Sequence, residues 1–426
     1  MMKRQMIATA VALLLPVLAF AQTPPAAAPT VAPAPQPGRG GGANTPIVSP
    51  EIAADGRVTF RLRAPAATAV NVAGLPDPLA MTKDEQGVWS ATTAAPLAAD
   101  IYAYTFDVDG ARVTDPSNAS NPLLPPPSRA ASQLMVPGAL WTSTDVPHGA
   151  VTRRVYKSPI IGADETYYVY TPPGYDAKRK KAYPVVVLLH GLGDQAPDWL
   201  AQGGANLTLD GLIAQGKAVP MILVSPSSYG NNAGTRGAAA GFPNFTNVLI
   251  DEIMPQVERE YNASKRALDH AVSGLSMGAA QSPLLLNRLD QFAWIGEFSP
   301  GFDMYGRINN PINAAGGAGG APGPGRGGAG AAPALQINGV RMRAVLADNV
   351  IAPLFPKLSA KDNAKIKLLY LACGTNDDHL ALQRQFKDFL DSRGVKITTY
   401  LEVPNYAHEW PFWRLEFSEF AQRIFK

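Results

Sequence analysis

Hydrophobic and polar positions alternate through residues 47–140. In "RVTFRLRAP", Phe60 and Leu62 fall on one face of an extended chain, and polar or charged residues occupy the other face. This alternation predicts half-buried strands. "GVWSATT" and "DIYAYTFDVDGARV" continue the pattern, and the Asp-Gly pair in the second stretch predicts a tight hairpin. Because no helical period appears, we expect a small β-sandwich of immunoglobulin-like type.

The hydrophobic pattern changes to continuous apolar runs in residues 141–426. The runs "YPVVVLLHG", "VPMILVSP", "LDHAVSG", "KIKLLYLACG" and "KITTYLEVP" are typical of strands that are covered on both faces. Amphipathic stretches predict helices between these runs, at residues 247–261, 279–288, 379–392 and 410–425. Strands that alternate with helices predict an α/β fold with a mostly parallel central sheet.

Two segments lack the apolar residues that a core requires. Residues 22–46 are rich in proline, alanine and glycine, which predicts a flexible linker. Residues 313–333 are rich in glycine and alanine, which predicts a disordered surface loop inserted in the α/β domain.

The first 21 residues have the pattern of a signal peptide. Lys3 and Arg4 precede an apolar run over residues 6–20, and an Ala-Phe-Ala cleavage pattern follows. A retained membrane anchor is the alternative, but the run is short for a membrane span. We therefore expect an exported bacterial protein, periplasmic or extracellular, with no membrane association once residues 1–21 are removed.

Length indicates the number of domains, and charge limits the possible partners. A chain of 426 residues predicts two domains. The net charge is +3, and removing the two cationic residues of the leader lowers it to +1. So small a charge gives no reason to expect binding to nucleic acid or to an anionic membrane. Cys373 is the single cysteine, which excludes an intrachain disulfide and predicts a small buried hydrophobic side chain.

Ser276 is the candidate nucleophile. It lies in "HAVSGLSMGAAQ", where an apolar strand is followed by a Gly-x-Ser-x-Gly pattern and an amphipathic helix. In an α/β-hydrolase such a serine occupies a sharp turn between strand and helix, and the small residues on either side let the backbone close. A simple turn of small residues is the alternative, and the sequence around the pentapeptide argues against it.

Two backbone amides are candidates for the oxyanion hole. One belongs to Met277, which directly follows Ser276, and the other to Leu192 in "HGLGD", which ends an earlier strand. His190 in the same turn is an alternative general base, but it precedes the serine, and we expect it to brace the loop.

The candidate acid and base follow Ser276 in the order that the fold requires. "LACGTNDDHL" places Asp377 and Asp378 after a late strand. One of the two is expected to cap the next helix, and we favour Asp377 as the acid. His408 lies in the loop after the following strand and is the candidate base. The remaining histidines lie in a linker, in a strand or at the start of a helix.

These roles predict an acyl-enzyme mechanism. His408 takes the proton of Ser276, which attacks an ester carbonyl, while Asp377 orients the imidazole. Water activated by His408 then releases the acid. We expect no metal and no cofactor, because the five histidines show no spacing typical of metal ligands.

The second half of the chain resembles carbohydrate esterase family 1, which includes the feruloyl and acetylxylan esterases and has enterochelin esterases as relatives. The resemblance rests on "ETYYVYTPPGYD", "YPVVVLLHGLGD", "GLSMG", "ACGTNDD" and "AHEWPFWR". It implies an α/β-hydrolase fold and a secreted esterase acting on esterified plant polysaccharide or its fragments, with Ser276, Asp377 and His408 as the triad. Gly278-Ala279 stands where many relatives have Gly-Gly. Residues 313–333 interrupt a region in which relatives often contact substrate.

The first domain resembles the family 48 carbohydrate-binding modules, on "VTFRLRAPAATAVNVAG" and "IYAYTFDVDGARVTDPSN". This resemblance implies that surface aromatic residues stack on sugars, and Trp89, Tyr102 and Tyr104 are the candidates. The alternative is that these three side chains fill the core of the sandwich.

Substrate choice stays open between feruloyl, acetyl and siderophore-type esters, and between hydrolysis and acyl transfer. Tyr229, Phe242 and Trp410 are candidate substrate-binding residues, although Tyr229 and Phe242 equally suit a role in pinning their loop. A non-catalytic carbohydrate-binding protein is the alternative from another class, and the complete set of Ser276, Asp377 and His408 argues against it. The sequence assigns no oligomeric state.

Overall fold

The computed structural model describes residues 46–118, 121–230, 242–308, 335–346 and 348–426. The predicted signal peptide, nearly all of the predicted linker and the predicted glycine-rich loop lie outside these residues. Residues Ile47–Lys426 form one compact unit. In the described ranges, no helix is both long enough and apolar enough to cross a membrane.

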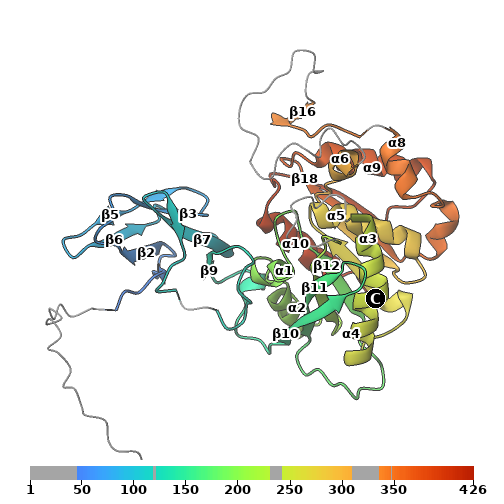
Figure 1. Ribbon diagram of the computed structural model, residues 1–426, viewed down its shortest axis with the longest axis horizontal. Helices are drawn as coiled ribbons and strands as arrows, with labels where there is room; N and C mark the ends of the chain where they lie inside the picture. The colour runs from blue at the N-terminus through green and yellow to red at the C-terminus, as the bar shows by residue number, and fades with distance from the viewer. Residues whose placement is uncertain (1–45, 119–120, 231–241, 309–334, 347) are drawn as a thin grey trace, which may run out of the picture. The chain divides into compact units, whose positions relative to one another are not determined.

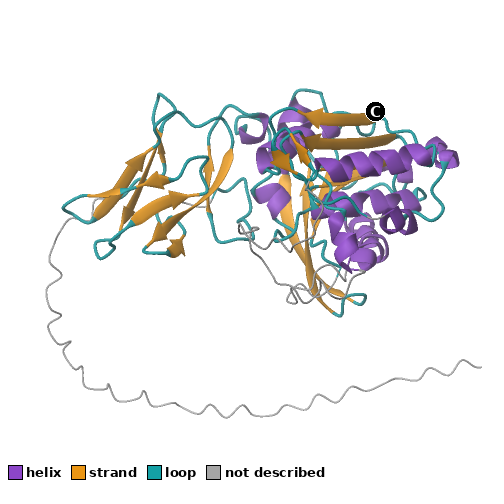
Figure 2. Cartoon of the chain, turned by 90° about the horizontal axis from the view of Figure 1, so that it is seen from above, coloured by secondary structure: helices purple, strands orange, loops and turns teal. Residues whose placement is uncertain are grey.

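Two antiparallel sheets build the first part of this unit, whose described residues form strands and loops but no α-helix (Figures 1 and 2). The first sheet has the order β1-β2-β6-β5, with bounds Glu51–Ile52, Val58–Arg63, Val88–Thr92 and Thr82–Lys83. The second has the order β4-β3-β7-β8, with bounds Leu79–Ala80, Val70–Ala73, Ile101–Val108 and Ala111–Val113. Strand β9 (Ser132–Met135) pairs with β7.

The core of this sandwich follows the predicted alternation. Phe60 and Leu62 of β2 are buried, and Arg61 between them is more exposed. The predicted hairpin joins β7 to β8 through Asp109 and Gly110, whose φ angles are 50° and 87°. Positive φ at both central residues matches the twist of the two strands, which is why an Asp-Gly pair is favoured there.

The aromatic residues proposed as sugar platforms have different positions. Trp89 and Tyr104 lie in the core of the sandwich, and the Trp89 indole donates a hydrogen bond to the Ala64 carbonyl. The prediction that they fill the core is therefore confirmed for these two. Tyr102 is only half-buried.

An eight-stranded sheet forms the centre of the second part. Its order is β10-β11-β13-β12-β14-β15-β18-β19, and all pairs from β13 to β19 are parallel, whereas β10 and β11 are antiparallel to their neighbours. The strands are Ala150–Ser158, Ala163–Thr171, Ile222–Pro226, Val185–Leu189, His270–Gly274, Trp294–Phe298, Leu368–Gly374 and Thr399–Val403. The predicted mostly parallel sheet is confirmed.

Helices cover both faces of this sheet and bury a separate core on each (Figure 1). One face carries α1 (Asp198–Ala201), α2 (Ala205–Ala214) and α10 (Trp410–Ala421). The other carries α3 (Phe242–Asn247), α4 (Met254–Glu260), α5 (Met277–Gln281) and α9 (Leu380–Ser392). In β12, Val185 and Val187 enter one core and Val186 enters the other, which explains its continuous apolar sequence.

Several predicted elements differ in detail. The helix expected over 247–261 is a π-helix (Val248–Ile253) followed by α4, and the one expected over 279–288 is α5 followed by a 3-10 helix (Ser282–Arg288). A proline stands near the start of each second piece and lacks the N–H that continuous helical bonding needs.

The predicted apolar runs do not include the edge strand β10 or the inner strand β15. In β10 most residues are polar and at least partly exposed, as expected at a sheet edge. In β15 a glycine and a glutamate interrupt the apolar run. Short helices α6 (Asp303–Ile308) and α8 (Asp348–Ile351) and the hairpin of β16 (Gln336–Ile337) and β17 (Val340–Arg341) complete the α-helices and strands of the described ranges.

That glutamate leaves a carboxyl group unpaired inside the sheet. Glu297 is fully buried, and neither of its carboxyl oxygens has a hydrogen-bond partner among the described residues. Burial raises the pKa of this carboxyl well above its ordinary value, because an ionised group is not solvated there. Glu297 is therefore a neutral acid in the folded protein under conditions that ionise an exposed glutamate.

We expect Glu297→Gln to raise the melting temperature at about pH 8 and to change it little at about pH 4. Above the ordinary glutamate pKa, the unfolded chain releases the proton that the folded chain keeps. The wild type therefore loses free energy of unfolding as the pH rises, by about 1.4 kcal/mol for each unit by which the pKa is raised. Thermal melts at both pH values measure the difference, with exposed Glu419→Gln as the control. Equal melting temperatures for Glu297→Gln and wild type at the higher pH would contradict the prediction.

Candidate functional site

Ser276 occupies a strained turn between β14 and α5. Its φ and ψ angles are 53° and −111°, which is unusual for a residue with a side chain. Its amide donates a hydrogen bond to the Phe298 carbonyl, and its carbonyl accepts one from the Gly301 amide. These bonds to the neighbouring strand hold the turn, and strain of this kind is common at functional positions.

The two glycines of the pentapeptide are required by close backbone contacts. A Cβ atom on Gly274 would lie 2.5 Å from the backbone of Gly278, and one on Gly278 would lie 2.2 Å from the Leu189 carbonyl oxygen. Neither position has room for a side chain. The pattern that suggested a strand-to-helix elbow therefore has a direct steric cause, and Ser276 is half-buried at its tip.

The "HGLG" turn after β12 lies beside this serine. A Cβ atom on Gly191 would meet both the Leu275 side chain and the Cβ of Ser276, so the two turns are in close contact. The next residue, Leu192, has an exposed side chain and lines the same cavity as Ser276. Met277 is the first residue of α5, where backbone N–H groups have no acceptor within the helix. Both predicted oxyanion donors thus belong to backbone beside Ser276.

His190 braces the first of these turns. Its Nδ1 donates to the Gly191 carbonyl over 2.8 Å, and its Nε2 accepts a hydrogen bond from the Ser228 amide over 3.0 Å. Burial lowers its pKa to about 4, so the ring is neutral at physiological pH. Both ring nitrogens are engaged in holding loops, which argues against the alternative of His190 as the base.

Tyr229 lies behind the same turn. Its hydroxyl accepts a hydrogen bond from the Gly193 amide and donates one to the Asp194 carbonyl, and only 6% of the residue is exposed. Between the two roles considered for Tyr229, these contacts favour pinning a loop over contacting a substrate. The side chain of Phe242 lies outside the described part of the chain, although this residue begins α3.

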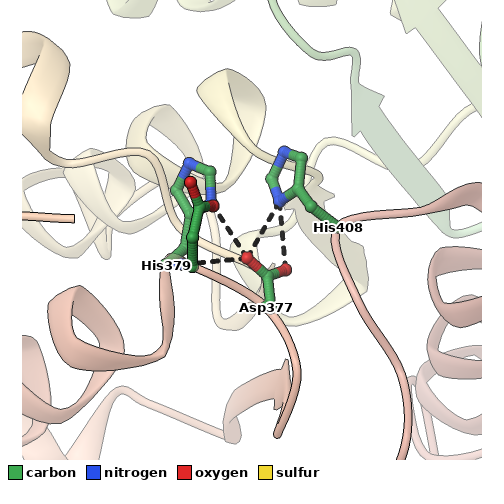
Figure 3. A group of neighbouring side chains, drawn as sticks. Asp377, His379 and His408 are labelled. Atoms are coloured by element: carbon green, nitrogen blue, oxygen red, sulfur yellow. Dashed lines mark hydrogen bonds and ion pairs between the residues drawn. The ribbon is translucent and has the colours of Figure 1, made fainter. Parts of the chain in front are cut away.

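Asp377 and His408 are brought together by the ends of two neighbouring strands. Asp377 follows β18 and His408 follows β19, and these strands are adjacent and parallel. The Nδ1 of His408 lies 3.0 Å and 3.2 Å from the two carboxylate oxygens of Asp377 (Figure 3). Asp378 instead pairs with Arg343, with 3.0 Å between its Oδ2 and the arginine Nε. The geometry therefore favours Asp377 over Asp378 as the partner of the histidine.

The charges of this pair suit proton transfer at neutral pH. Burial alone would raise the pKa of Asp377, but hydrogen bonds from His379 and His408 lower it below its ordinary value. Burial lowers the pKa of His408; its bond to Asp377 opposes this shift, and the charge of His379 adds to it. Asp377 is thus an ionised acceptor, and His408 is a neutral imidazole that can take up a proton.

His379 belongs to the site, although its place at the start of a helix gave no reason to expect this. It is the residue before α9, and its backbone and side chain both contact Asp377 (Figure 3). The only signal in the sequence was its adjacency to the two aspartates, which gives no direction to its ring.

Four side chains here have the chemistry of metal ligands. Asp377, Asp378, His379 and His408 bring their ligand-type atoms within 4.8 Å of one another. The hydrogen bonds and ion pairs among them account for this closeness, so we assign no metal to the group.

A cavity of about 650 Å³ opens at Ser276 and His408. Apolar and aromatic residues form much of its wall, among them Leu75, Tyr102 and Trp410. Trp410, a candidate substrate-binding residue, is half-buried and packs edge-on against Trp199 and Trp413. The volume is typical of a site for a small molecule.

Part of this wall comes from residues before position 140, which the sequence did not predict. Arg414 of α10 donates to the Asp100 carboxylate over 2.6 Å, to the Ile101 carbonyl over 2.7 Å and to the Gln202 carbonyl over 2.8 Å. This arginine is almost fully buried, and such a charge requires partners of this kind. The bonds connect the start of β7 with the helix that follows His408.

A family model, described as "Putative esterase", matches residues 158–423. The chain is also 31% identical over 276 residues to the endo-1,4-beta-xylanase/feruloyl esterase of Xylanibacter ruminicola. That match covers 62% of this chain and spans 37% of the length of the relative.

Solved structures support the same fold. The CE1 ferulic acid esterase of Anaeromyces mucronatus, in complex with ferulic acid, superimposes with a TM-score of 0.51 at 22% identity, over 66% of this chain and 93% of that one. The enterobactin esterase of Shigella flexneri superimposes with a TM-score of 0.53 at 17% identity, over 86% of this chain and 92% of that one. The chain therefore belongs to the esterase family and has the α/β-hydrolase fold.

Proposed function

We propose that the protein is an exported carboxylic ester hydrolase that acts through an acyl-enzyme on esterified plant polysaccharide or its fragments. A feruloyl ester is the first candidate substrate and an acetylated xylan the second. The relative from Xylanibacter ruminicola, named as a xylanase and feruloyl esterase, supports this substrate class.

One observation carries the proposal. A serine in an elbow with φ of 53° shares a cavity with a histidine whose Nδ1 is hydrogen-bonded to a buried carboxylate. A nucleophile, a base and an orienting acid in this order are what acyl transfer through a serine requires. A protein that only binds carbohydrate has no need for this combination.

In the proposed mechanism, His408 removes the proton of the Ser276 hydroxyl through Nε2, and the serine oxygen attacks the ester carbonyl. Asp377 accepts the Nδ1–H of His408, which fixes the tautomer and stabilises the imidazolium. The amides of Leu192 and Met277 donate to the developing oxyanion. The alcohol leaves with the proton from His408, and a water molecule activated by the same histidine then releases the acid.

The cavity wall is consistent with an aromatic acyl group. Tyr102, Trp410 and Trp413 line it, and aromatic rings stack favourably on one another. Two of the three come from α10, directly after His408, so they lie close to the reacting carbonyl. An acetyl group would leave much of this apolar surface without contact, which is why we place the feruloyl ester first.

A siderophore ester is the alternative substrate outside the plant polysaccharides. The superposition on the enterobactin esterase of Shigella flexneri extends over 86% of this chain and so includes residues outside the α/β part. The aromatic acyl groups of a catechol siderophore would meet the same wall. Acyl transfer to an acceptor other than water uses the same residues.

We expect Ser276→Ala to lower kcat for p-nitrophenyl acetate by about 10³-fold or more, because the nucleophile is lost. Steady-state kinetics on the full chain measure the loss, and the melting temperature controls for folding. Equal rates in the variant and the wild type would rule out Ser276 as the nucleophile.

The two neighbouring aspartates are expected to differ strongly. Asp377→Asn removes the acceptor of the His408 Nδ1–H and should lower kcat by about 10³-fold or more. Asp378→Asn weakens the ion pairs with Arg343 and His379 but leaves the acceptor of His408 in place, and it should cost less than about tenfold. The same assay compares them, and a larger loss in Asp378→Asn would reverse the assignment of the acid.

Methyl ferulate and acetylated xylan, assayed side by side, test the substrate class. We expect kcat/KM to be higher for methyl ferulate and to fall when Trp410→Ala removes part of the aromatic wall. The same substitution should lower kcat/KM for acetylated xylan less than for methyl ferulate, because a small acyl group makes fewer contacts. Faster hydrolysis of acetylated xylan by the wild type would refute the preference for feruloyl esters.

A further inference from the structure

Two histidines share the carboxylate of Asp377. The backbone N–H of His379 donates to Oδ1 over 2.9 Å, and the Nδ1 of His379 lies 2.9 Å from the same oxygen (Figure 3). The Nδ1 of His408 reaches the carboxylate from the other strand end. Three N–H groups thus hold one carboxylate, two of them from His379.

His379 also contacts the imidazole of His408 directly. The two rings are stacked, with their centroids 4.0 Å apart and their planes 15° from parallel. Trp413 meets the His408 ring edge-on, at 4.9 Å and 87°. His379 therefore touches both the carboxylate that orients the base and the base itself, and its own side chain is almost fully buried.

The charged groups around His379 favour its protonated form. Its Nδ1 lies 2.8 Å from Asp378 Oδ1 and 2.9 Å from Asp377 Oδ1. Across from these carboxylates, Arg343 pairs with both Asp378 and Asp303. Burial by itself would lower the pKa of His379, but the hydrogen bonds to the two carboxylates raise it above its ordinary value.

We propose that His379 is a positioning residue for ester hydrolysis. It fixes the carboxylate of Asp377 through two N–H groups and supports the ring of His408 by stacking. This inference rests on the proposed roles of Ser276, Asp377 and His408.

The stacked arrangement has a consequence for the base. A positive His379 repels the positive charge that His408 acquires when it is protonated, so His408 stays neutral to a lower pH than it otherwise would. Neutral His408 is the form that takes the serine proton. Removing the charge at position 379 should therefore move the acidic limb of the kcat/KM profile to higher pH.

Two substitutions separate the hydrogen bond from the ring. His379→Asn keeps a side-chain N–H near the position of Nδ1 but removes the ring and its charge. His379→Phe keeps a stacking ring but removes the donor and the charge. With p-nitrophenyl acetate as substrate, both variants should shift the acidic limb upward, and kcat should fall by about tenfold or more in His379→Phe and less in His379→Asn.

His270→Asn is the matched control, because His270 is equally buried and lies at the opposite end of β14 from Ser276. It should leave the position of the acidic limb unchanged. If the His379 variants lower kcat without moving the limb, His379 is only structural and the inference is wrong.

An NMR titration measures the pKa of His408 directly and therefore does not depend on enzyme turnover. In full-length Ser276→Ala, the pKa of His408 should rise when His379→Asn is added, and an unchanged value would overturn the inference. If Ser276→Ala retains the wild-type rate, the proposed function fails instead, and the titration still tests the contact between the two histidines.

Discussion

The buried carboxylate of Asp377 is the group on which the rest of the site depends. It has no exposed surface, and a charge in that position is unfavourable unless hydrogen bonds replace the lost water. The fold supplies these bonds by ending β18 and β19 side by side, so that His379 and His408 meet at one carboxylate. The same requirement explains why both histidines are held in fixed orientations.

Close backbone contacts in the elbow and in the "HGLG" turn position Ser276 and the two candidate oxyanion amides. The backbone contacts at Gly274 and Gly278 leave no space for a side chain on either side of Ser276, which has a positive φ. On the other side of the cavity, the bonds of Arg414 to Asp100 and Ile101 bring residues of the sandwich to the wall. The sandwich therefore has a part in shaping the site, whether or not it binds sugar itself. With Trp89 and Tyr104 in its core, Tyr102 is the one of the three proposed sugar-stacking aromatics that lines this cavity.

The sequence predicted those features that local pattern determines. Apolar runs identified β12, β13, β14, β18 and β19, alternation identified β2, and the order of Ser276, Asp377 and His408 followed from the hydrolase topology. The stacking of His379 on His408 depends on where β19 ends, which no local pattern contains. Asp100 and Arg414 are 314 residues apart, so the sequence does not predict their ion pair either. Glu297 places a residue that is normally charged inside the apolar run of β15, although its carboxyl is neutral when buried.

Covalent labelling of the nucleophile tests the central claim most directly. The full chain is incubated with a fluorophosphonate, digested and analysed by mass spectrometry. We expect one adduct per chain, on the peptide that contains Ser276, and a much slower reaction in Asp377→Asn because His408 is no longer oriented. An adduct on another residue, or no adduct in an enzyme that hydrolyses p-nitrophenyl acetate, would contradict it.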